Sequence, residues 1–224
     1  GSCAFAEVPD GDAFLTWDGT RISTGRIPEG GTQGDVVPGV RVFAGSLGDP
    51  DARTAADPGL MGMAGTFPVP SSNTLRLRTA VRRFDQVTLS FPTAPSGDYF
   101  RVYLAGVQAA TPGSPLALGS TFTLPVGSGA GTEGAWHYHP FWEINSAAPF
   151  GIYLAEVDIR NSTTNVASEP FWFVWNYEAD ASNPANNVDA AYEWANANLV
   201  PTPGVTGAFL LAGAMTIARR RRKE

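Results

Sequence analysis

The chain has 224 residues, among them 25 glycines, 18 prolines and a single cysteine. Residues 219–224 hold five of its fifteen basic residues and one of its twenty-one acidic residues, which leaves ten arginines and twenty carboxylates, a net charge near −10, for the rest. So acidic a surface disfavours binding to nucleic acid or to an anionic membrane surface. One cysteine excludes an internal disulfide and a cysteine-based metal site.

The N-terminal residues GSCAFAEVPDG contain the small-x-small pattern Ala4-Phe5-Ala6, which is typical of signal-peptide cleavage. We interpret residues 1–6 as a signal-peptide remnant or a scar left by cloning, with a lipid-modified Cys3 as the rival hypothesis. Residues 7–199 are long enough to bury one full core without disulfides or metals, and we treat them as one domain.

Short strand patterns begin at residue 12. Residues 12–24 predict a hairpin that turns at Asp18-Gly19, a dipeptide favoured in two-residue turns. Residues 39–45 predict a strand. Residues 45–68 contain glycine and proline too often for regular structure, and they predict a long ordered loop.

The middle of the chain alternates apolar and polar residues, as half-buried strands do. Residues 73–79 place Leu75 and Leu77 on one face and two arginines on the other, while residues 84–91 place Val87, Leu89 and Phe91 together. Further strands are predicted at 98–107 and 120–126.

The last strands are residues 135–144 and an antiparallel pair at 150–160 and 169–178. PFWFVWN, residues 170–176, is apolar on both faces and is therefore placed centrally in a sheet. Residues 187–199 predict the one helix, capped by Asn187. The fold class is all-β: an antiparallel β-sandwich, jelly-roll or immunoglobulin-like, with one short C-terminal helix.

The only two histidines, His137 and His139, stand one residue apart in GAWHYHPFWEI. On a strand they point to the same face, where two neutral imidazoles could bind Zn²⁺ or Cu²⁺. Since no other histidine exists, the further ligands must be carboxylates or water. The candidates are Glu143 on the same strand, which would need a bend at Pro140, and the more distant Asp10 and Asp12. The alternative is that both histidines only pack among the neighbouring aromatic residues.

The C-terminus joins a proline turn, an uncharged stretch and a basic cluster. These are Pro201, Thr202, Pro203 and Gly204, then residues 205–218, then Arg219, Arg220, Arg221, Arg222 and Lys223. This order resembles the PEP-CTERM sorting signal, although Thr202 stands where that family has glutamate. The resemblance implies export from a bacterium, with residues 200–224 as a sorting and anchor segment whose apolar stretch forms a membrane-sorting helix, recognised by an exosortase in the inner membrane.

Residues 134–178 resemble a group of PEP-CTERM proteins that share three motifs. The matching residues are Trp136-His137-x-His139, Pro149-x-Gly151-x-Tyr153-Leu154 and Ser168-Glu169-Pro170-Phe171-x-x-Val174-x-Asn176. Some members are similar to proteins under zinc-responsive control, which implies a link to zinc or another transition metal. Asp10-Gly11-Asp12 replaces an early histidine of that pattern, which leaves a site completed by carboxylates or no site.

No nucleophile elbow, phosphate loop or marked carboxylate pair is present in the sequence. We therefore expect an exported, surface-anchored, non-catalytic binding or structural protein of the bacterial envelope or extracellular matrix. Matrix polysaccharide is a further candidate partner. The alternative is a secreted hydrolase acting on envelope or matrix polysaccharide.

Overall fold

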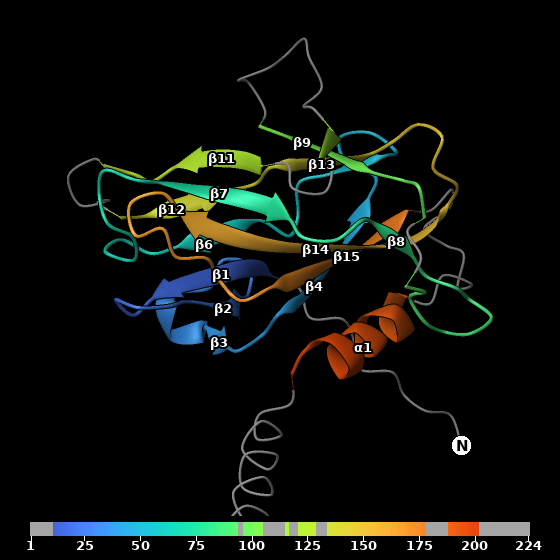
Figure 1. Ribbon diagram of the computed structural model, residues 1–224, viewed down its shortest axis with the longest axis horizontal. Helices are drawn as coiled ribbons and strands as arrows, with labels where there is room; N and C mark the ends of the chain where they lie inside the picture. The colour runs from blue at the N-terminus through green and yellow to red at the C-terminus, as the bar shows by residue number, and fades with distance from the viewer. Residues whose placement is uncertain are drawn as a thin grey trace, which may run out of the picture.

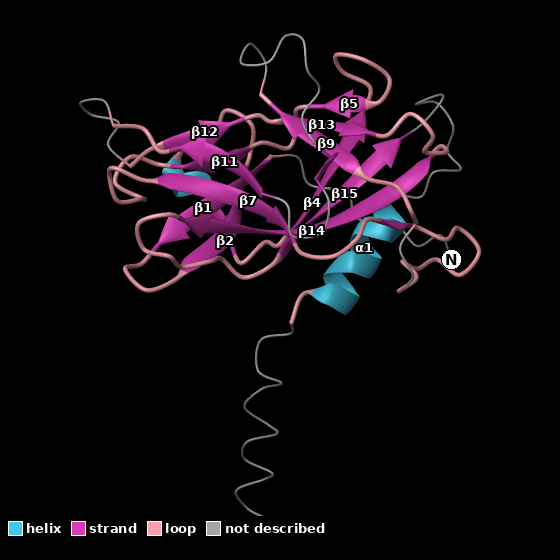
Figure 2. Cartoon of the chain, turned by 45° about the horizontal axis from the view of Figure 1, so that its top comes forward, coloured by secondary structure: helices cyan, strands magenta, loops and turns pink. Residues whose placement is uncertain are grey.

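The computed structural model describes residues 11–93, 96–104, 115–116, 121–128, 134–177 and 188–201. This part of the chain forms three β-sheets, one α-helix and one 3-10 turn (Figures 1 and 2). The elements are β1 Asp12–Trp17, β2 Ile22–Ile27, η1 Gln33–Asp35, β3 Val37–Pro38, β4 Val42–Leu47, β5 Thr54–Ala55, β6 Leu60–Gly62, β7 Ser72–Leu77, β8 Arg82–Arg83, β9 Phe100–Tyr103, β10 Pro115–Leu116, β11 Thr121–Pro125, β12 Trp136–Tyr138, β13 Phe141–Ile144, β14 Gly151–Asn161, β15 Phe171–Tyr177 and α1 Val188–Leu199.

The six-stranded sheet is the middle layer of the molecule. Its strands run in the order β11-β7-β14-β15-β4, and β8 pairs with β14 beside this path. β15 lies between β14 and β4, so the predicted central position of PFWFVWN is confirmed. Alternate side chains of β15 enter two different cores: Phe171, Phe173 and Trp175 face one, whereas Trp172 and Val174 face the other. A strand buried on both sides has to be apolar throughout.

The main core lies between this sheet and the two others. The five-stranded sheet has the order β12-β6-β1-β2-β3, and the four-stranded sheet has the order β10-β9-β13-β5. Large side chains from all three sheets meet there, among them Leu15, Trp136, Phe100, Trp142 and Tyr153, each at most 1% exposed. Several of these rings contact one another edge-on, as Phe100 does with Trp142. At about 25 cal/mol per Å² of apolar surface, such rings supply the dominant stabilising term of this core.

The second core lies on the opposite face of β15 and is covered by α1 (Figure 1). Ala191 and Ala195 of α1 are fully buried there, and Trp194 packs edge-on against Phe91. The predicted helix at 187–199 is therefore present from Val188 onward, while its expected cap, Asn187, lies outside the described residues.

The all-β class with one short helix is confirmed. The pairings are not all antiparallel as predicted, because β1 runs parallel to β6 and β4 runs parallel to β15. Parallel neighbours require crossover connections, and short strand patterns in a sequence carry no information about such crossovers. The choice between jelly-roll and immunoglobulin-like topology stays a prediction.

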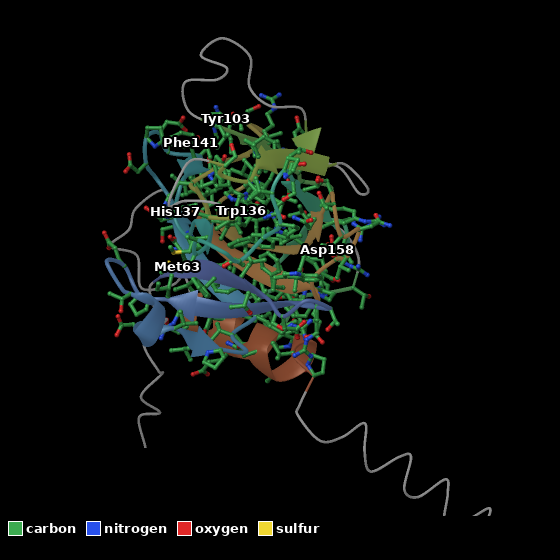
Figure 3. All side chains as sticks on the ribbon, turned by 90° about the vertical axis from the view of Figure 1, so that its left-hand side faces the viewer. Met63, Tyr103, Trp136, His137, Phe141 and Asp158 are labelled. Atoms are coloured by element: carbon green, nitrogen blue, oxygen red, sulfur yellow. The ribbon has the colours of Figure 1, made fainter. Side chains whose placement is uncertain are left out.

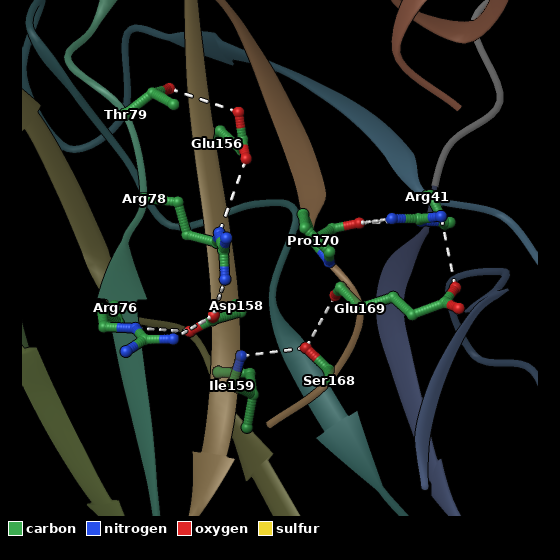
Figure 4. Close-up of polar contacts among 10 residues, drawn as sticks. All are labelled: Arg41, Arg76, Arg78, Thr79, Glu156, Asp158, Ile159, Ser168, Glu169 and Pro170. Atoms are coloured by element: carbon green, nitrogen blue, oxygen red, sulfur yellow. Dashed lines mark hydrogen bonds and ion pairs between the residues drawn. The ribbon is translucent and has the colours of Figure 1, made fainter. Parts of the chain in front are cut away.

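The predicted alternation over residues 73–79 is confirmed. Leu75 and Leu77 are buried, whereas Arg76 and Arg78 lie on the other face and are partly exposed. Both arginines form ion pairs with Asp158 on β14 (Figure 4). Asp158 is fully buried, and it accepts hydrogen bonds from Arg76 Nε at 3.0 Å and Arg78 Nη1 at 2.8 Å. The hydrogen bond to Asp158 also raises the pKa of Arg76. The two arginines thus compensate a carboxylate that would otherwise be costly to bury.

The hairpin predicted at residues 12–24 is confirmed as β1 and β2, but its turn is longer than expected. Trp17 pairs with Ile22, so four residues connect the strands instead of two. The Asp18 carboxylate accepts hydrogen bonds from the backbone N–H of Thr20 and Arg21, at 2.8 and 2.7 Å. This side chain stabilises the wider turn, since it takes the place of backbone partners.

The strand predicted at residues 84–91 is wrong. Val87 is 92% exposed, and Leu89 has a φ of 47° and is 46% exposed. The Asp85 carboxylate accepts hydrogen bonds from the backbone N–H of Val87 and Thr88, so the segment closes as a turn. Hydrogen bonds from an aspartate side chain to the backbone compete in this way with strand pairing. The apolar alternation of the sequence gave no sign of this turn.

The long loop predicted at residues 45–68 contains the short strands β5 and β6. β6 is an inner strand of the five-stranded sheet, because it pairs with β1 on one side and β12 on the other. Three residues are too few to show a hydrophobic period, so the strand left no pattern in the sequence.

The ends of the chain lie mostly outside the described residues. Pro201 is described and exposed, whereas residues 1–6, Thr202, Pro203, Gly204 and Arg219–Arg222 lie outside. Within the described ranges, no helix is both long and apolar enough to cross a bilayer.

Candidate metal centre

His137 lies on β12 and His139 follows its end, at the edge of the five-stranded sheet. Their Nε2 atoms are 2.8 Å apart, so the predicted position on one face is confirmed. Trp136 of β12 is buried in the main core, and Tyr138 donates its hydroxyl to the Pro125 carbonyl. Figure 3 shows His137 near the surface and Trp136 deeper in the molecule. The strand ends before Pro140, and β13 continues in the four-stranded sheet.

Asp12 reaches the histidines across one intervening strand. β6 separates β1 from β12, and Leu60 pairs with Ala13 on one side and with Tyr138 on the other. Gly59 immediately precedes β6 and therefore lies between Asp12 and His139. A Cβ on Gly59 would come within 2.8 Å of the His139 ring and 3.0 Å of Asp12 Oδ1. The two side chains meet only because glycine leaves this space empty.

Asp12, His137 and His139 offer three ligand atoms that lie close together. Asp12 Oδ2 is 3.2 Å from His137 Nε2 and 3.6 Å from His139 Nε2. With metal–ligand distances of about 2.0–2.1 Å, a tetrahedral zinc site needs ligand atoms about 3.4 Å apart. The three observed separations, including the 2.8 Å between the Nε2 atoms, lie around this value. The group can hold a metal ion after shifts of a few tenths of an ångström.

A second layer of hydrogen bonds orients these ligands. Asp57 Oδ1 lies 2.7 Å from His139 Nδ1, and a carboxylate there accepts the Nδ1 proton, which leaves the Nε2 lone pair free for a metal. The Gly59 N–H donates to Asp12 Oδ1 at 2.6 Å, so the other oxygen, Oδ2, faces the histidines. The segment 57–59 is itself held against β4, where a Cβ on Gly45 would overlap the Asp57 carbonyl oxygen. One short segment therefore positions two of the three ligands.

The other predicted ligands are not brought to this group. Glu143 lies on β13, where its carboxylate faces Arg101 of β9 at 3.9 Å. The bend at Pro140 moves β13 into a different sheet instead of returning Glu143 to the histidines. Asp10 lies outside the described residues.

A hollow of about 590 Å³ adjoins the three ligands. Its wall includes Asp12, His137 and His139, together with the carboxylates of Glu29, Asp49 and Asp57. Neither lysine nor arginine occurs among the described residues that line it. The hollow therefore has a negative potential, which concentrates cations near the ligand group.

Comparison of the chain with protein-family models, curated proteins and solved structures produced no match.

The sequence pattern identified the two histidines and included Asp12 among its candidates, but it missed Asp57 and Gly59. Both lie in the segment 45–68, which was expected to be irregular. The signal that could have found them is chemical: an Asp-Pro-Gly sequence supplies a carboxylate for a histidine and a glycine for a close approach. The position of β6 between β1 and β12 brings this Asp-Pro-Gly sequence next to Asp12 and the histidines.

Proposed function

We propose that this protein binds a divalent transition metal, zinc or copper, through Asp12, His137 and His139. The observation that carries the proposal is the convergence of their three ligand atoms, at separations of 2.8 to 3.6 Å. Two imidazoles and one carboxylate form a donor set that suits Zn²⁺ and Cu²⁺.

The outer hydrogen bonds support metal binding over a packing role. Histidines that only pack need no carboxylate on Nδ1, whereas metal-ligating histidines almost always have such a partner. His139 has this partner in Asp57, and the histidine side chains are 51% and 39% exposed. Exposure on this scale leaves room for an ion to enter from solvent.

We further propose that the chain is exported and held at the bacterial surface as a non-catalytic binding protein. The support is the PEP-CTERM-like order of Pro201–Gly204, an uncharged stretch and Arg219–Arg222. The acidic charge of the remaining chain, near −10, suits a protein that collects cations outside the cell.

Isothermal calorimetry on tag-free protein tests the metal proposal. We expect saturable binding of one Zn²⁺ or Cu²⁺ per chain at neutral pH, and we expect the His137→Ala, His139→Ala double variant to show none. Asp18→Asn is the matched control, because it removes one carboxylate at the far end of β1, about 20 Å from Asp12. It should bind metal as the unaltered protein does.

Thermal melting of the same proteins separates binding from packing. A binding role predicts that zinc raises the melting temperature of the unaltered protein and of Asp18→Asn, but leaves that of the double variant unchanged. Equal metal uptake by all three proteins, or no uptake by any of them, would contradict the proposal.

A further inference from the structure

The candidate site differs from a closed structural metal site in the number of its protein ligands. Among the described residues, the group consists of Asp12, His137 and His139. No further histidine, cysteine or carboxylate of the described residues belongs to it as a fourth ligand. Asp57 contacts Nδ1 of His139, on the side of the ring away from Nε2, so it orients a ligand without itself completing the site. Structural zinc sites have four protein ligands, whereas sites with three keep one position for water or for another molecule.

The remaining position lies beside the hollow. Both histidines and Asp12 form part of its wall, and its volume of about 590 Å³ falls within the range of small-molecule sites. Other parts of the wall come from Glu29, Gly30 and Gly31 after β2, from Gly45 and Ser46 of β4, and from Asp49. Gly30 has nothing within 4 Å of the position where a Cβ would be, so this part of the wall is open.

The charge of the wall decides which donor can enter. The carboxylates are those of Asp12, Glu29, Asp49 and Asp57, and no described lining residue carries a positive side chain. A divalent ion would offset two of these four charges, so a bound ion still leaves the hollow negative. Anionic donors are therefore repelled, and neutral or cationic donors are favoured.

We propose that the ion completes its coordination with a nitrogen donor of the imidazole class from a second molecule, such as a histidine-bearing peptide, seated in this hollow. The inference rests on the metal binding proposed above, and it makes the site one at which an ion is shared with or passed to another molecule. Borderline ions such as Zn²⁺ and Cu²⁺ accept imidazole nitrogen readily, which matches the two histidines already present.

The test uses the full chain loaded with Co²⁺, whose visible absorption reports its ligands. Free imidazole and imidazole-4-propionate, which share the donor ring but differ by a remote carboxylate, are titrated separately. We expect both to shift the Co²⁺ band, with imidazole binding at least about threefold more tightly. A Glu29→Gln, Asp49→Asn double variant should bring the two affinities together, and Asp18→Asn should leave the difference unchanged.

Three results would overturn the inference while leaving metal binding intact. The Co²⁺ band could be insensitive to imidazole, the two donors could bind equally well, or Asp10→Ala could change the band before any donor is added. The last result would mean that Asp10 already fills the fourth position. Failure of Co²⁺, Zn²⁺ and Cu²⁺ to bind at all would instead refute the proposed function.

Discussion

Gly59 shows how one residue without a side chain can determine a site. Its φ is not in the left-handed region, so the requirement for glycine is spatial and not conformational. A Cβ on Gly59 would lie only 2.8 Å from the ring of His139 and 3.0 Å from the carboxylate of Asp12. Gly59 also donates its N–H to Asp12, which sets the direction of the carboxylate.

We predict that Gly59→Ala weakens metal binding without removing a ligand. The added methyl group would push His139 and Asp12 apart, and we expect metal affinity to fall by about 10- to 100-fold, as when outer-sphere partners are lost. Gly34→Ala is the control, because a Cβ there would meet only Thr32 Oγ1 at 3.8 Å. Calorimetry that shows equal affinity for Gly59→Ala and Gly34→Ala would contradict this role of Gly59.

Tyr153 is a buried phenol whose ionisation is linked to folding. Burial, with a smaller contribution from the charge of Asp98, raises its pKa to about 12, and its hydroxyl donates to the Pro149 carbonyl. In the unfolded chain the pKa of a tyrosine is about 10. The folded state therefore holds the proton more tightly, and the stability that this supplies is complete below pH 10 and is lost as pH rises towards 12.

We predict that unfolding by urea at pH 9 and pH 11.5 will show this loss. The free energy of unfolding of the unaltered protein should fall more between these pH values than that of Tyr153→Phe, which has no proton to lose at this position. Tyr153→Phe should start about 1 kcal/mol less stable because the Pro149 carbonyl loses its partner. An equal fall in both proteins would mean that Tyr153 is not the group responsible.

At the scale of elements, β12 and β13 show how one continuous pattern can serve two sheets. Residues 135–144 were predicted as one strand, but the chain leaves the five-stranded sheet after Tyr138 and enters the four-stranded sheet at Phe141. Proline lacks the N–H that a continued ladder would need, so Pro140 is a natural place for this change. The change separates Glu143 from the histidines and leaves the metal group to Asp12.

The segment 84–91 shows the opposite case, in which alternation did not produce a strand. Phe84 and Phe91 are buried in the second core, and the residues between them form a turn capped by Asp85. Spacing alone could not distinguish a strand from two anchors joined by a turn. The side-chain hydrogen bonds of Asp85 decided the outcome.

For the whole molecule, the three-sheet arrangement places α1 away from the four-stranded sheet (Figure 1). The predicted sorting signal begins at Pro201 and includes the arginine cluster at 219–222. A positive cluster after an apolar stretch stays in the cytoplasm, which would leave the preceding residues outside.

We predict that protease added to intact bacteria expressing the full chain will digest the region before Val200. A cytoplasmic marker protein in the same cells should stay intact, as the control for lysis. Replacing Arg219–Arg222 with serine should reduce retention in the membrane fraction, because the charge that holds the orientation is lost. Protection of the region before Val200 in intact cells would contradict export.

The sequence by itself determined the all-β class, the double-sided burial of β15, the helix near residue 188 and the shared face of His137 and His139. The strand patterns and the shared face of the histidines follow from a period of two residues, whereas the burial of β15 and the helix follow from local composition and capping. All of these signals lie within short stretches of the sequence. Only the tertiary structure decided that Asp12 joins the histidines, that Glu143 does not, and that Asp57 and Gly59 orient the group. These contacts depend on β6 lying between β1 and β12, and the order of strands in a sheet is set by long-range packing of the whole chain, which no local pattern contains.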